Sequence, residues 1–468
     1  MPEFRIFESA IQSAALKLAL VPVICLGASN LALAADYRVP AQTATFDCGR
    51  VKPGDSVTLS SGTRGPLRIQ GCNGTAANPI IIRNDPNASA RTVISRSGGS
   101  AGGFLFDCTT CIGVEIDGSY KWNGAPKNKT YGIKIMLASG PEPTSFLRVA
   151  GLSRFVTIRN IEIAGIFPNG ASTGIGISIN DHSIKRINHP GLWREGYLVE
   201  DNYIHNVSVS GMYIGPNYDQ KELPLRNVEI RHNLIEDTGW EGINTKSMWA
   251  GENSIHHNVI RRAGLNGNRS DDPSQYSGIT NNSGTVEIYN NWIEKTGQHG
   301  IMVWTSQGPK ASEGVGPFPT HIWNNVIVDA GGLWRPFMLS SYGIRVGAED
   351  GCAKPIPYVY DNTIVDSRQS AINFGSNVGS GGYVHDNIIA GVESNPISAP
   401  GFIKLTNNRV GSVSQMGFVD AARLNFRLNA NSPARNKGSD SFPQIDFDNV
   451  TRPKGGAPDQ GAFEATSP

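Results

Sequence analysis

The stretch EIRHNLIEDTGWEGINTK, residues 229–246, contains two patterns that recur along the chain and together decide its fold. The first pattern is an apolar residue, two further residues, an asparagine, and an isoleucine or valine two positions later. The asparagines of the repeat are Asn160, Asn202, Asn233, Asn258, Asn291, Asn325, Asn362 and Asn387. Their irregular spacing does not suit a helical solenoid but suits a coil of short strands joined by loops of variable length. Asparagine tolerates the left-handed backbone conformation, so we expect each copy at a tight corner, where stacked amides exchange hydrogen bonds.

The second pattern is a glycine followed by alternating apolar and variable positions, as in Gly242-Ile-Asn-Thr-Lys. Copies begin at Gly174, Gly211, Gly242, Gly278, Gly300 and Gly343. A period of two indicates a half-buried strand, so we expect the first apolar residue of each copy to point inward and stack. These residues are Ile175, Met212, Ile243, Ile279, Ile301 and Ile344. The sequence predicts an all-β, right-handed parallel β-helix with coils ~4.8 Å apart. A β-sandwich is the alternative, but a sandwich does not repeat one asparagine at one corner.

Four segments are expected along the chain. They are a signal peptide at 1–35, an N-terminal cap with the first coils at 36–110, the β-helix at 111–410 and an irregular C-terminal capping tail at 411–468. Arg5 and Lys17 precede an apolar run that ends in the small-residue site Ala32-Leu33-Ala34, which is typical of secretory signals. The tail lacks the repeat and is expected to cover the unpaired edge of the last coil. We therefore expect a secreted or periplasmic monomer with no membrane association after cleavage.

The net charge and the cysteine pattern argue against nucleic-acid binding, anionic membrane binding and thiol redox chemistry. The formal net charge is +1, which gives no support for a nucleic-acid partner or an anionic membrane surface. Cys48 and Cys72 flank the N-terminal segment and are candidates for a disulfide across the cap. Cys108 and Cys111 are interpreted as structural, because nothing near them resembles a redox βαβ unit, and Cys352 is left over.

The outward positions of the glycine strands form one continuous face. One outward row is Gly176, Tyr213, Asn244, Thr280, Met302, Arg345 and Asn373, and the next is Ser178, Gly215, Lys246, Asn282, Trp304, Gly347 and Gly375. The longest loops flank this strand column, and long loops on one face of a solenoid usually build its binding surface. The inward column turns polar at Thr245 and Asn281. Such a break marks either a functional site or a satisfied buried pair.

Lys246 is the favoured catalytic base, because it lies in the middle of this face beside Tyr213 and Asn244. An ammonium held out of water or near other cations loses its proton more readily. Its amine would then take the C5 proton of a uronic acid. A solvated surface lysine is the alternative interpretation.

Several other residues are candidates for the same site. Tyr213, Arg269 and His299 are further catalytic candidates. His299 directly precedes Gly300 and is expected to face the same groove, but it is equally well interpreted as structural. The substrate-binding candidates are Asn244, Asn282, Trp249, Trp304 and Arg345. Asp271 and Asp272 suit Ca²⁺, a hard ion that takes oxygen ligands, but they also suit a glycosidase acid–base pair or a simple turn.

The segment EGINTKS, residues 241–247, resembles the strand of chondroitinase B and related alginate lyases that carries a glutamate five residues before a lysine. The resemblance implies that Lys246 is the base and that Glu241 helps to bind a calcium ion, which neutralises the substrate carboxylate. This chain has Gly239 where that family has a second glutamate, and Asn282 where it has a catalytic arginine. Arg269 is the candidate to replace that arginine, because Arg345 lies three coils away.

These observations support four functions to different degrees. The favoured one is a lyase that cleaves an acidic, uronic-acid-containing polysaccharide by β-elimination. A C5-epimerase would share its first step. A glycoside hydrolase would use two of Glu241, Asp271 and Asp272, and a non-catalytic binder would use only the aromatic and amide face. Ultraviolet absorbance of an unsaturated uronide distinguishes a lyase from a hydrolase, which releases reducing ends without that absorbance.

Overall fold

The computed structural model describes residues 34–98, 102–122, 130–167, 173–216, 222–266, 275–306, 316–334, 340–375, 377–392, 394–439 and 443–466. The chain divides into two units, Met1–Ala34 and Ala35–Pro468, and all described strands belong to the second. The expected signal peptide lies almost entirely outside the described residues. Within the described part, no helix is long and apolar enough to cross a membrane.

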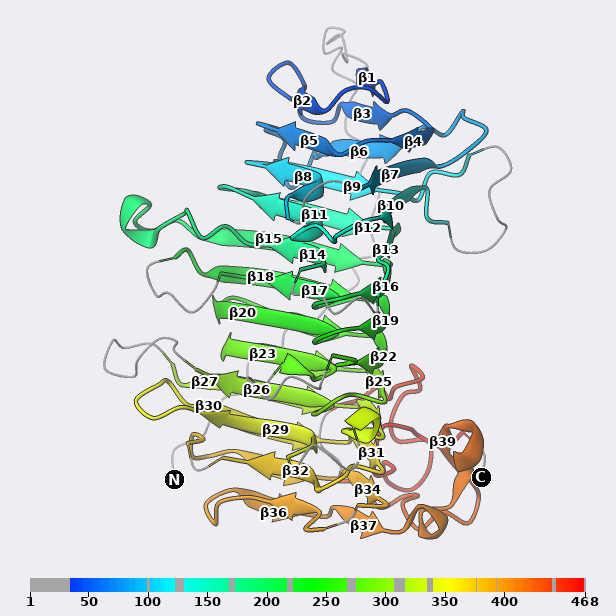
Figure 1. Cartoon of the computed structure of the whole chain (residues 1–468). Coiled ribbons are helices and arrows are strands. Elements are labelled where there is room, and N and C mark those ends of the chain that lie inside the picture. Colours follow the sequence, from blue (N-terminus) through cyan, green and yellow to red (C-terminus); the bar gives the residue numbers. More distant parts are fainter. Residues whose placement is uncertain are drawn as a thin grey trace, which may run out of the picture. The chain divides into compact units, whose positions relative to one another are not determined.

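The second unit is a parallel β-helix whose coils stack in three ladders (Figure 1). The first ladder contains β2 (Thr45–Asp47), β5 (Leu67–Gln70), β8 (Phe104–Thr109), β11 (Ser145–Ala150), β14 (Ile175–Ile179), β17 (Met212–Ile214), β20 (Ile243–Ala250), β23 (Ile279–Gly284), β26 (Ile301–Thr305), β29 (Tyr342–Ala348), β32 (Ser370–Phe374) and β35 (Ile397–Ser398). The second contains β1 (Asp36–Val39), β3 (Ser56–Leu59), β6 (Ile80–Asn84), β9 (Ile112–Asp117), β12 (Arg154–Arg159), β15 (Arg194–Glu200), β18 (Leu225–Arg231), β21 (Ser254–His256), β24 (Val286–Tyr289), β27 (Phe318–Trp323), β30 (Pro355–Tyr360), β33 (Tyr383–His385) and β36 (Lys404–Thr406). These two ladders join through β18 and β20 into one 25-stranded sheet.

The third ladder is a 12-stranded sheet. It contains β4 (Gly62–Arg64), β7 (Thr92–Ser97), β10 (Ile133–Ser139), β13 (Ile161–Ala164), β16 (Tyr203–Val207), β19 (Leu234–Thr238), β22 (Val259–Ala263), β25 (Trp292–Glu294), β28 (Val326–Val328), β31 (Thr363–Val365), β34 (Ile388–Ala390) and β37 (Arg409–Gly411). Short 3₁₀ helices occupy Arg186–Asn188 (η1), Gly332–Trp334 (η4), Val413–Gln415 (η5) and Ala421–Arg423 (η6).

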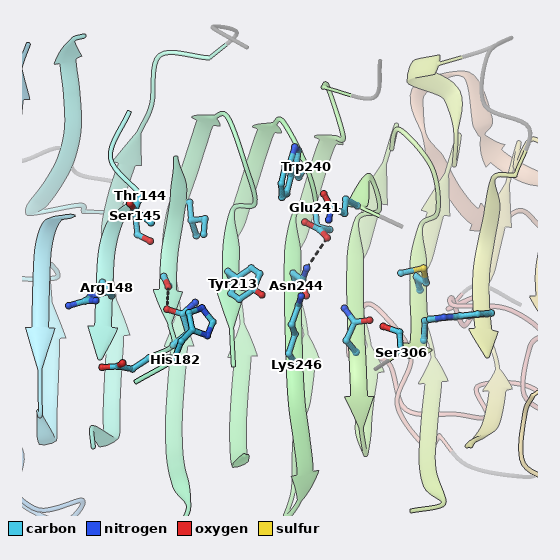
Figure 2. Close-up of a pocket in the computed structure, with 18 of the residues that line it drawn as sticks. Thr144, Ser145, Arg148, His182, Tyr213, Trp240, Glu241, Asn244, Lys246 and Ser306 are labelled. Atoms are coloured by element: carbon cyan, nitrogen blue, oxygen red, sulfur yellow. Dashed lines mark hydrogen bonds between the residues drawn. The ribbon is translucent and has the colours of Figure 1, made fainter. Parts of the chain in front are cut away.

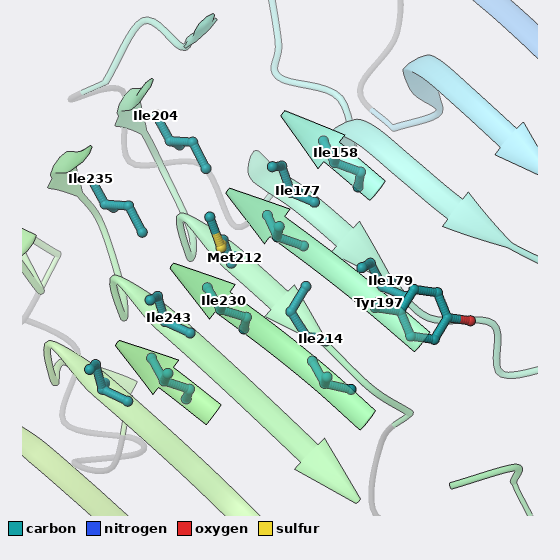
Figure 3. Close-up of a cluster of buried hydrophobic side chains, with 14 of the residues drawn as sticks. Ile158, Ile177, Ile179, Tyr197, Ile204, Met212, Ile214, Ile230, Ile235 and Ile243 are labelled. Carbon is teal, nitrogen blue, oxygen red and sulfur yellow. The ribbon is translucent and has the colours of Figure 1, made fainter. Parts of the chain in front are cut away.

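The core is a set of stacked aliphatic columns inside the coils (Figure 3). In the first ladder one column runs through Met212, Ile243, Ile279, Ile301 and Ile344, as predicted, and all five are buried. The glycine before each one lies against the next coil. A Cβ on Gly242, for example, would come within 2.7 Å of the Gly278 carbonyl oxygen.

The prediction for the first copy of this strand is wrong by two residues. Ile177, not Ile175, pairs with Met212, and Ile175 is only half-buried. The stretch from Gly174 to Ile179 contains two glycine–isoleucine pairs, so alternation fits both registers. Gly176 decides between them, because a Cβ there would lie 2.4 Å from the Gly211 carbonyl oxygen.

The asparagine ladder is confirmed from Asn202 to Asn387, and it extends to Asn408. Each side-chain amide donates to the Oδ1 atom of the next asparagine at 2.9–3.0 Å. The same Oδ1 atom also accepts from the backbone N–H of the preceding ladder residue. These bonds satisfy buried amides that would otherwise destabilise the fold.

Two details of that prediction are wrong. Asn160 is not a ladder member, because Ile161 takes the ladder position and its N–H donates to Asn202 Oδ1 at 3.1 Å. The left-handed conformation also belongs to the residue before each ladder asparagine. Those residues are Asp201, His232, His257, Asn290, Asn324, Asp361, Asp386 and Asn407, and Asn160 adopts the same conformation before Ile161.

The ends of the unit carry disulfides and the tail. Cys48 and Cys72 are bonded, as predicted, Cys108 is bonded to Cys111, and Cys352 is a buried thiol. In the tail, β38 (Phe418–Asp420) and β39 (Asn425–Leu428) form an antiparallel pair. The tail packs its aromatic side chains against β28, β31 and β34. In the last coils Phe402, Leu405 and Val410 stay about half exposed, so the tail covers the side of the coils and not these end residues.

A candidate active-site groove on the first ladder

A groove of about 790 Å³ follows the outward face of the first ladder from β8 to β29. Because coils stack ~4.8 Å apart, this part of the ladder spans roughly 34 Å. The predicted outward row is present, with Tyr213, Asn244, Thr280, Met302 and Arg345 side by side on successive coils. Ser178 replaces Gly176 at its start, because of the two-residue shift in β14. The length and openness of this face suit an extended polymer.

The groove brings together most of the site residues predicted from the sequence. They are Tyr213, Glu241, Asn244, Lys246, Asn282, Trp304 and Arg345. Trp249 does not line the groove, and its ring lies 5.8 Å from the guanidinium of Arg186. Arg269, Asp271 and Asp272 lie outside the described residues.

The centre of the groove holds a buried amine and a buried carboxyl group, with Asn244 between them (Figure 2). Lys246 is 5% exposed, and its Nζ lies 4.8 Å from the centroid of the Tyr213 ring. Glu241 is 1% exposed and accepts hydrogen bonds from Ser210 Oγ and Asn244 Nδ2, both at 2.7 Å. Burial raises the pKa of Glu241 to about 7, although these bonds and the charge of Lys246 act to lower it. Glu241 is therefore partly protonated near neutral pH.

The polar break in the inward column proves to be a satisfied pair. The Thr245 hydroxyl donates to Asn281 Oδ1 at 2.9 Å, and Asn281 Nδ2 donates to the Gly284 carbonyl oxygen at 3.3 Å. Both side chains are buried inside the coil. They stabilise the strands beneath Lys246 and do not face the groove.

At one end of the groove Arg345 is a cation without an acidic partner among the described residues. Its guanidinium lies 4.6 Å from the Trp304 ring centroid, and it forms no ion pair with any described residue. Its Nε is buried without a hydrogen-bond partner, and burial lowers its pKa. The Trp304 ring packs over Gly347, where an added Cβ would lie 2.3 Å from the ring. A partly buried, unpaired cation is costly, so this position favours an anionic ligand.

His299 is buried beneath the groove and does not line it, so the prediction that it faces the groove is wrong. The Tyr342 backbone N–H donates to its Nδ1 at 3.2 Å, and the two rings stack. Burial, followed by the nearby charge of Arg345, lowers the pKa of His299 well below its usual value. A neutral, enclosed imidazole fits the structural interpretation of this residue.

Several groove residues were missed by sequence reasoning. Arg148 lies on β11, where it is paired with Asp107 at 2.9 Å. Asp181 and His182 come from the loop after β14, and Glu349 follows β29. The loop residues follow no period, and the only sequence signal for them was their position beside the same strand column.

The described residues contain no group of three or more His, Cys, Asp or Glu side chains that could hold a metal ion. Of the three predicted calcium ligands, only Glu241 is described. Both of its oxygens already accept hydrogen bonds, and its pKa is raised. Calcium binding by Glu241 with Asp271 and Asp272 therefore stays a prediction.

Comparison with known protein families supports the assignment of the fold. Residues 149–314 match the family model described as a right handed beta helix region, and this stretch includes β14 to β26 of the groove. The fold is a right-handed parallel β-helix. No curated protein matches the sequence.

Solved structures similar to this chain include carbohydrate-active enzymes. The crystal structure of pectate lyase Pel9A is 16% identical, covers 92% of this chain and 96% of its own, and superposes with a TM-score of 0.52. An alginate lyase from Paenibacillus sp. str. FPU-7 is 14% identical, with coverage of 80% and 99% and a TM-score of 0.39. The GH136 lacto-N-biosidase from Eubacterium ramulus is 13% identical, with coverage of 81% and 68% and a TM-score of 0.44. At 16% identity the likeness to Pel9A concerns the fold alone.

Proposed function

We propose that this chain is a polysaccharide lyase that cleaves a uronic-acid-containing polymer by β-elimination. The observation that carries the proposal is the Lys246 amine, buried in the groove floor and close enough for its charge to act on Glu241, a carboxyl group whose pKa is about 7. An amine withdrawn from water gives up its proton more readily than a surface lysine. Lys246 is thus suited to be a general base near neutral pH.

In this reaction the Lys246 Nζ takes the C5 proton of the uronic acid. The electron pair of the broken C–H bond forms the C4–C5 double bond as the bond from C4 to the bridging oxygen breaks. The uronate carboxylate must be neutralised for the C5 proton to be removed. Asn282, which pairs with Lys246 on the next coil, offers an amide for that carboxylate, and Arg269 or a cation would supply positive charge.

Arg345 supports an acidic polymer as the substrate. It lies three coils from Lys246, or roughly 14 Å at ~4.8 Å a coil, too far to act on the same sugar carboxylate. We propose that its unpaired guanidinium binds the carboxylate of another sugar of the same chain. The fold is shared with Pel9A, which its name describes as a pectate lyase.

A glycoside hydrolase is the second candidate, and one observation favours it. A buried carboxyl group with a pKa of about 7, as in Glu241, is suited to protonate a glycosidic oxygen. Its partner would be Asp271 or Asp272, or else Asp181 or Glu349 in the groove. A C5-epimerase and a non-catalytic binder remain the other candidates. We also propose export of the protein and a monomeric state, on the basis of the sequence alone.

A screen of uronic-acid and neutral polysaccharides tests the proposal. We expect ultraviolet-absorbing unsaturated products from uronic-acid polymers only, with one new reducing end for each double bond. Reducing ends without that absorbance would indicate a hydrolase, and C5 inversion without cleavage would indicate an epimerase. Binding with no change in the polymer would identify a carbohydrate-binding protein.

The calcium prediction has a separate test. If Asp271 or Asp272 joins Glu241 around Ca²⁺, chelation should lower the activity, because the cation neutralises the substrate carboxylate. Added calcium should restore it, and magnesium, which keeps its water and demands a tighter geometry, should restore less. Full activity after exhaustive chelation would remove calcium from the mechanism.

A further inference from the structure

The loop between β14 and β15 holds a histidine at the rim of the groove by means of a buried glutamate. His182 Nδ1 lies 3.2 Å from Glu222 Oε2, and the other carboxylate oxygen, Oε1, lies 3.1 Å from Lys185 Nζ. Glu222 is 4% exposed, whereas the His182 side chain is 51% exposed and lines the groove. An antiparallel bridge between Lys185 and Glu222 fixes the loop at this point. The imidazole is therefore anchored on one side and open on the other.

The anchoring contact defines which nitrogen faces the substrate. A carboxylate oxygen only accepts hydrogen bonds, so His182 Nδ1 carries the hydrogen that points to Glu222. The Nε2 atom has no hydrogen-bond partner among the described residues. When the ring is protonated, Nε2–H is the donor that remains for a group bound in the groove, and Glu222 faces the positive charge. A histidine oriented by a carboxylate in this way is a common device of acid–base catalysis.

Strand register places this nitrogen near the proposed reaction centre. Ser178, Tyr213 and Asn244 lie side by side on β14, β17 and β20. Lys246 lies two residues beyond Asn244, and Asn180, two residues beyond Ser178, leads into the loop of His182. The Lys246 Nζ leans back over the Tyr213 ring, toward β14. Figure 2 shows His182 and Lys246 on either side of Tyr213, so a sugar seated on that ring would meet both.

We propose that His182, positioned by Glu222, donates the proton that the leaving oxygen needs in the β-elimination; this rests on the proposed lyase function. Lys246 removes the C5 proton, the C–H electron pair forms the C4–C5 double bond, and the bond from C4 to the bridging oxygen breaks. That oxygen takes the proton of His182 Nε2 and leaves as a hydroxyl group. His182 then regains a proton from water, and the Lys246 ammonium loses one to water, so both groups return to their starting forms.

A leaving-group comparison tests this role. His182→Ala is assayed on the polymer from which the wild type releases unsaturated product, and on a uronide that carries nitrophenoxide at C4, a leaving group that needs no proton. We expect kcat to fall about 100-fold or more on the polymer, the usual effect of losing a general acid, and to change little on the activated uronide. Glu222→Gln should show the same contrast to a smaller extent. His189→Ala, in the same loop but outside the groove, is the matched control and should behave as the wild type.

The alternative outcomes overturn the inference in different ways. Equal losses on both substrates would mean that His182 only supports the loop. Wild-type turnover of the polymer by His182→Ala would mean that another group donates the proton. Lys246→Ala should lose activity on both substrates, and this result distinguishes the role of the base from that of the acid. A wild-type enzyme that forms reducing ends without unsaturated product removes the lyase function itself, and that result is seen before any variant is assayed.

Discussion

Replacing Lys246 with alanine should abolish turnover and leave the fold and much of the substrate binding intact. Loss of a positioned proton acceptor typically lowers a rate by about two to four orders of magnitude. Lys246 is the one lysine among the described groove residues, and its Nζ lies against Tyr213. Arg345 and Trp304, which are proposed to bind the polymer, are unchanged in this variant. The measurements are kcat from the absorbance of the unsaturated product, and the dissociation constant of an uncleaved oligosaccharide.

Two variants control this experiment. Lys246→Arg keeps the positive charge but stays protonated at any working pH, so it should be as inactive as the alanine variant. Lys295→Ala removes an exposed lysine at a corner outside the groove and should keep wild-type activity. A Lys246→Ala protein with more than about a tenth of wild-type turnover would be incompatible with a general-base role. The base would then be sought at Tyr213.

The fold was predictable because its determinants are periodic. The glycine before each inward isoleucine and the asparagine at each corner repeat once a coil, and together they place Asn244 beside Thr280 and Met302 beside Arg345 correctly. Periodicity does not determine the strand register where one stretch of sequence fits the glycine–apolar repeat in two ways. In the stretch from Gly174 to Ile179 the two registers differ by two residues, so both put isoleucine on the same face. Only the close approach of Gly176 to the next coil separates them.

The residue types at the left-handed corner are informative, but the left-handed conformation was predicted one position too late, at the ladder asparagines themselves. Asparagine, aspartate and histidine are the non-glycine residues enriched in that conformation. The residues that adopt it before the ladder asparagines are all of these types, as Asp201, His232 and Asn290 illustrate. In copies such as Asn290-Asn291 both the corner residue and the ladder residue are asparagine, so the sequence does not show which of the two is left-handed. The ladder asparagines are selected for their stacked amides and not for their backbone conformation.

The groove residues that lie on strands could be predicted from the sequence, whereas those in loops could not. Tyr213, Lys246 and Arg345 were placed by alternation along strands whose register the glycines determine. His182 lies in a loop, and its partner Glu222 belongs to another coil, so no spacing in the sequence connects them. His299 precedes its strand, and the bend of the chain, not alternation, decides the direction of its side chain. Geometry of this kind emerges only when the coils are stacked.

Ile243→Asp should destabilise the middle coils severely. Ile243 is fully buried between Met212 and Ile279 in the inward column (Figure 3). An unpaired carboxylate in this column has no partner, and such changes cost several kcal/mol, a large part of a protein's total stability. A loss of that size lowers the melting temperature of a protein this large by about 5 °C or prevents folding. Circular dichroism melting and the yield of soluble protein measure the effect.

The controls for Ile243→Asp also test the orientation of the site. Ile187→Asp makes the same change at a loop position that is 84% exposed and should leave the melting temperature unchanged. Ile243→Val removes one methyl group and should cost about 1 kcal/mol. An unchanged melting temperature for Ile243→Asp would mean that Ile243 faces outward. Because side chains alternate along a strand, Asn244 and Lys246 would then face inward, and the groove could not contain the proposed base.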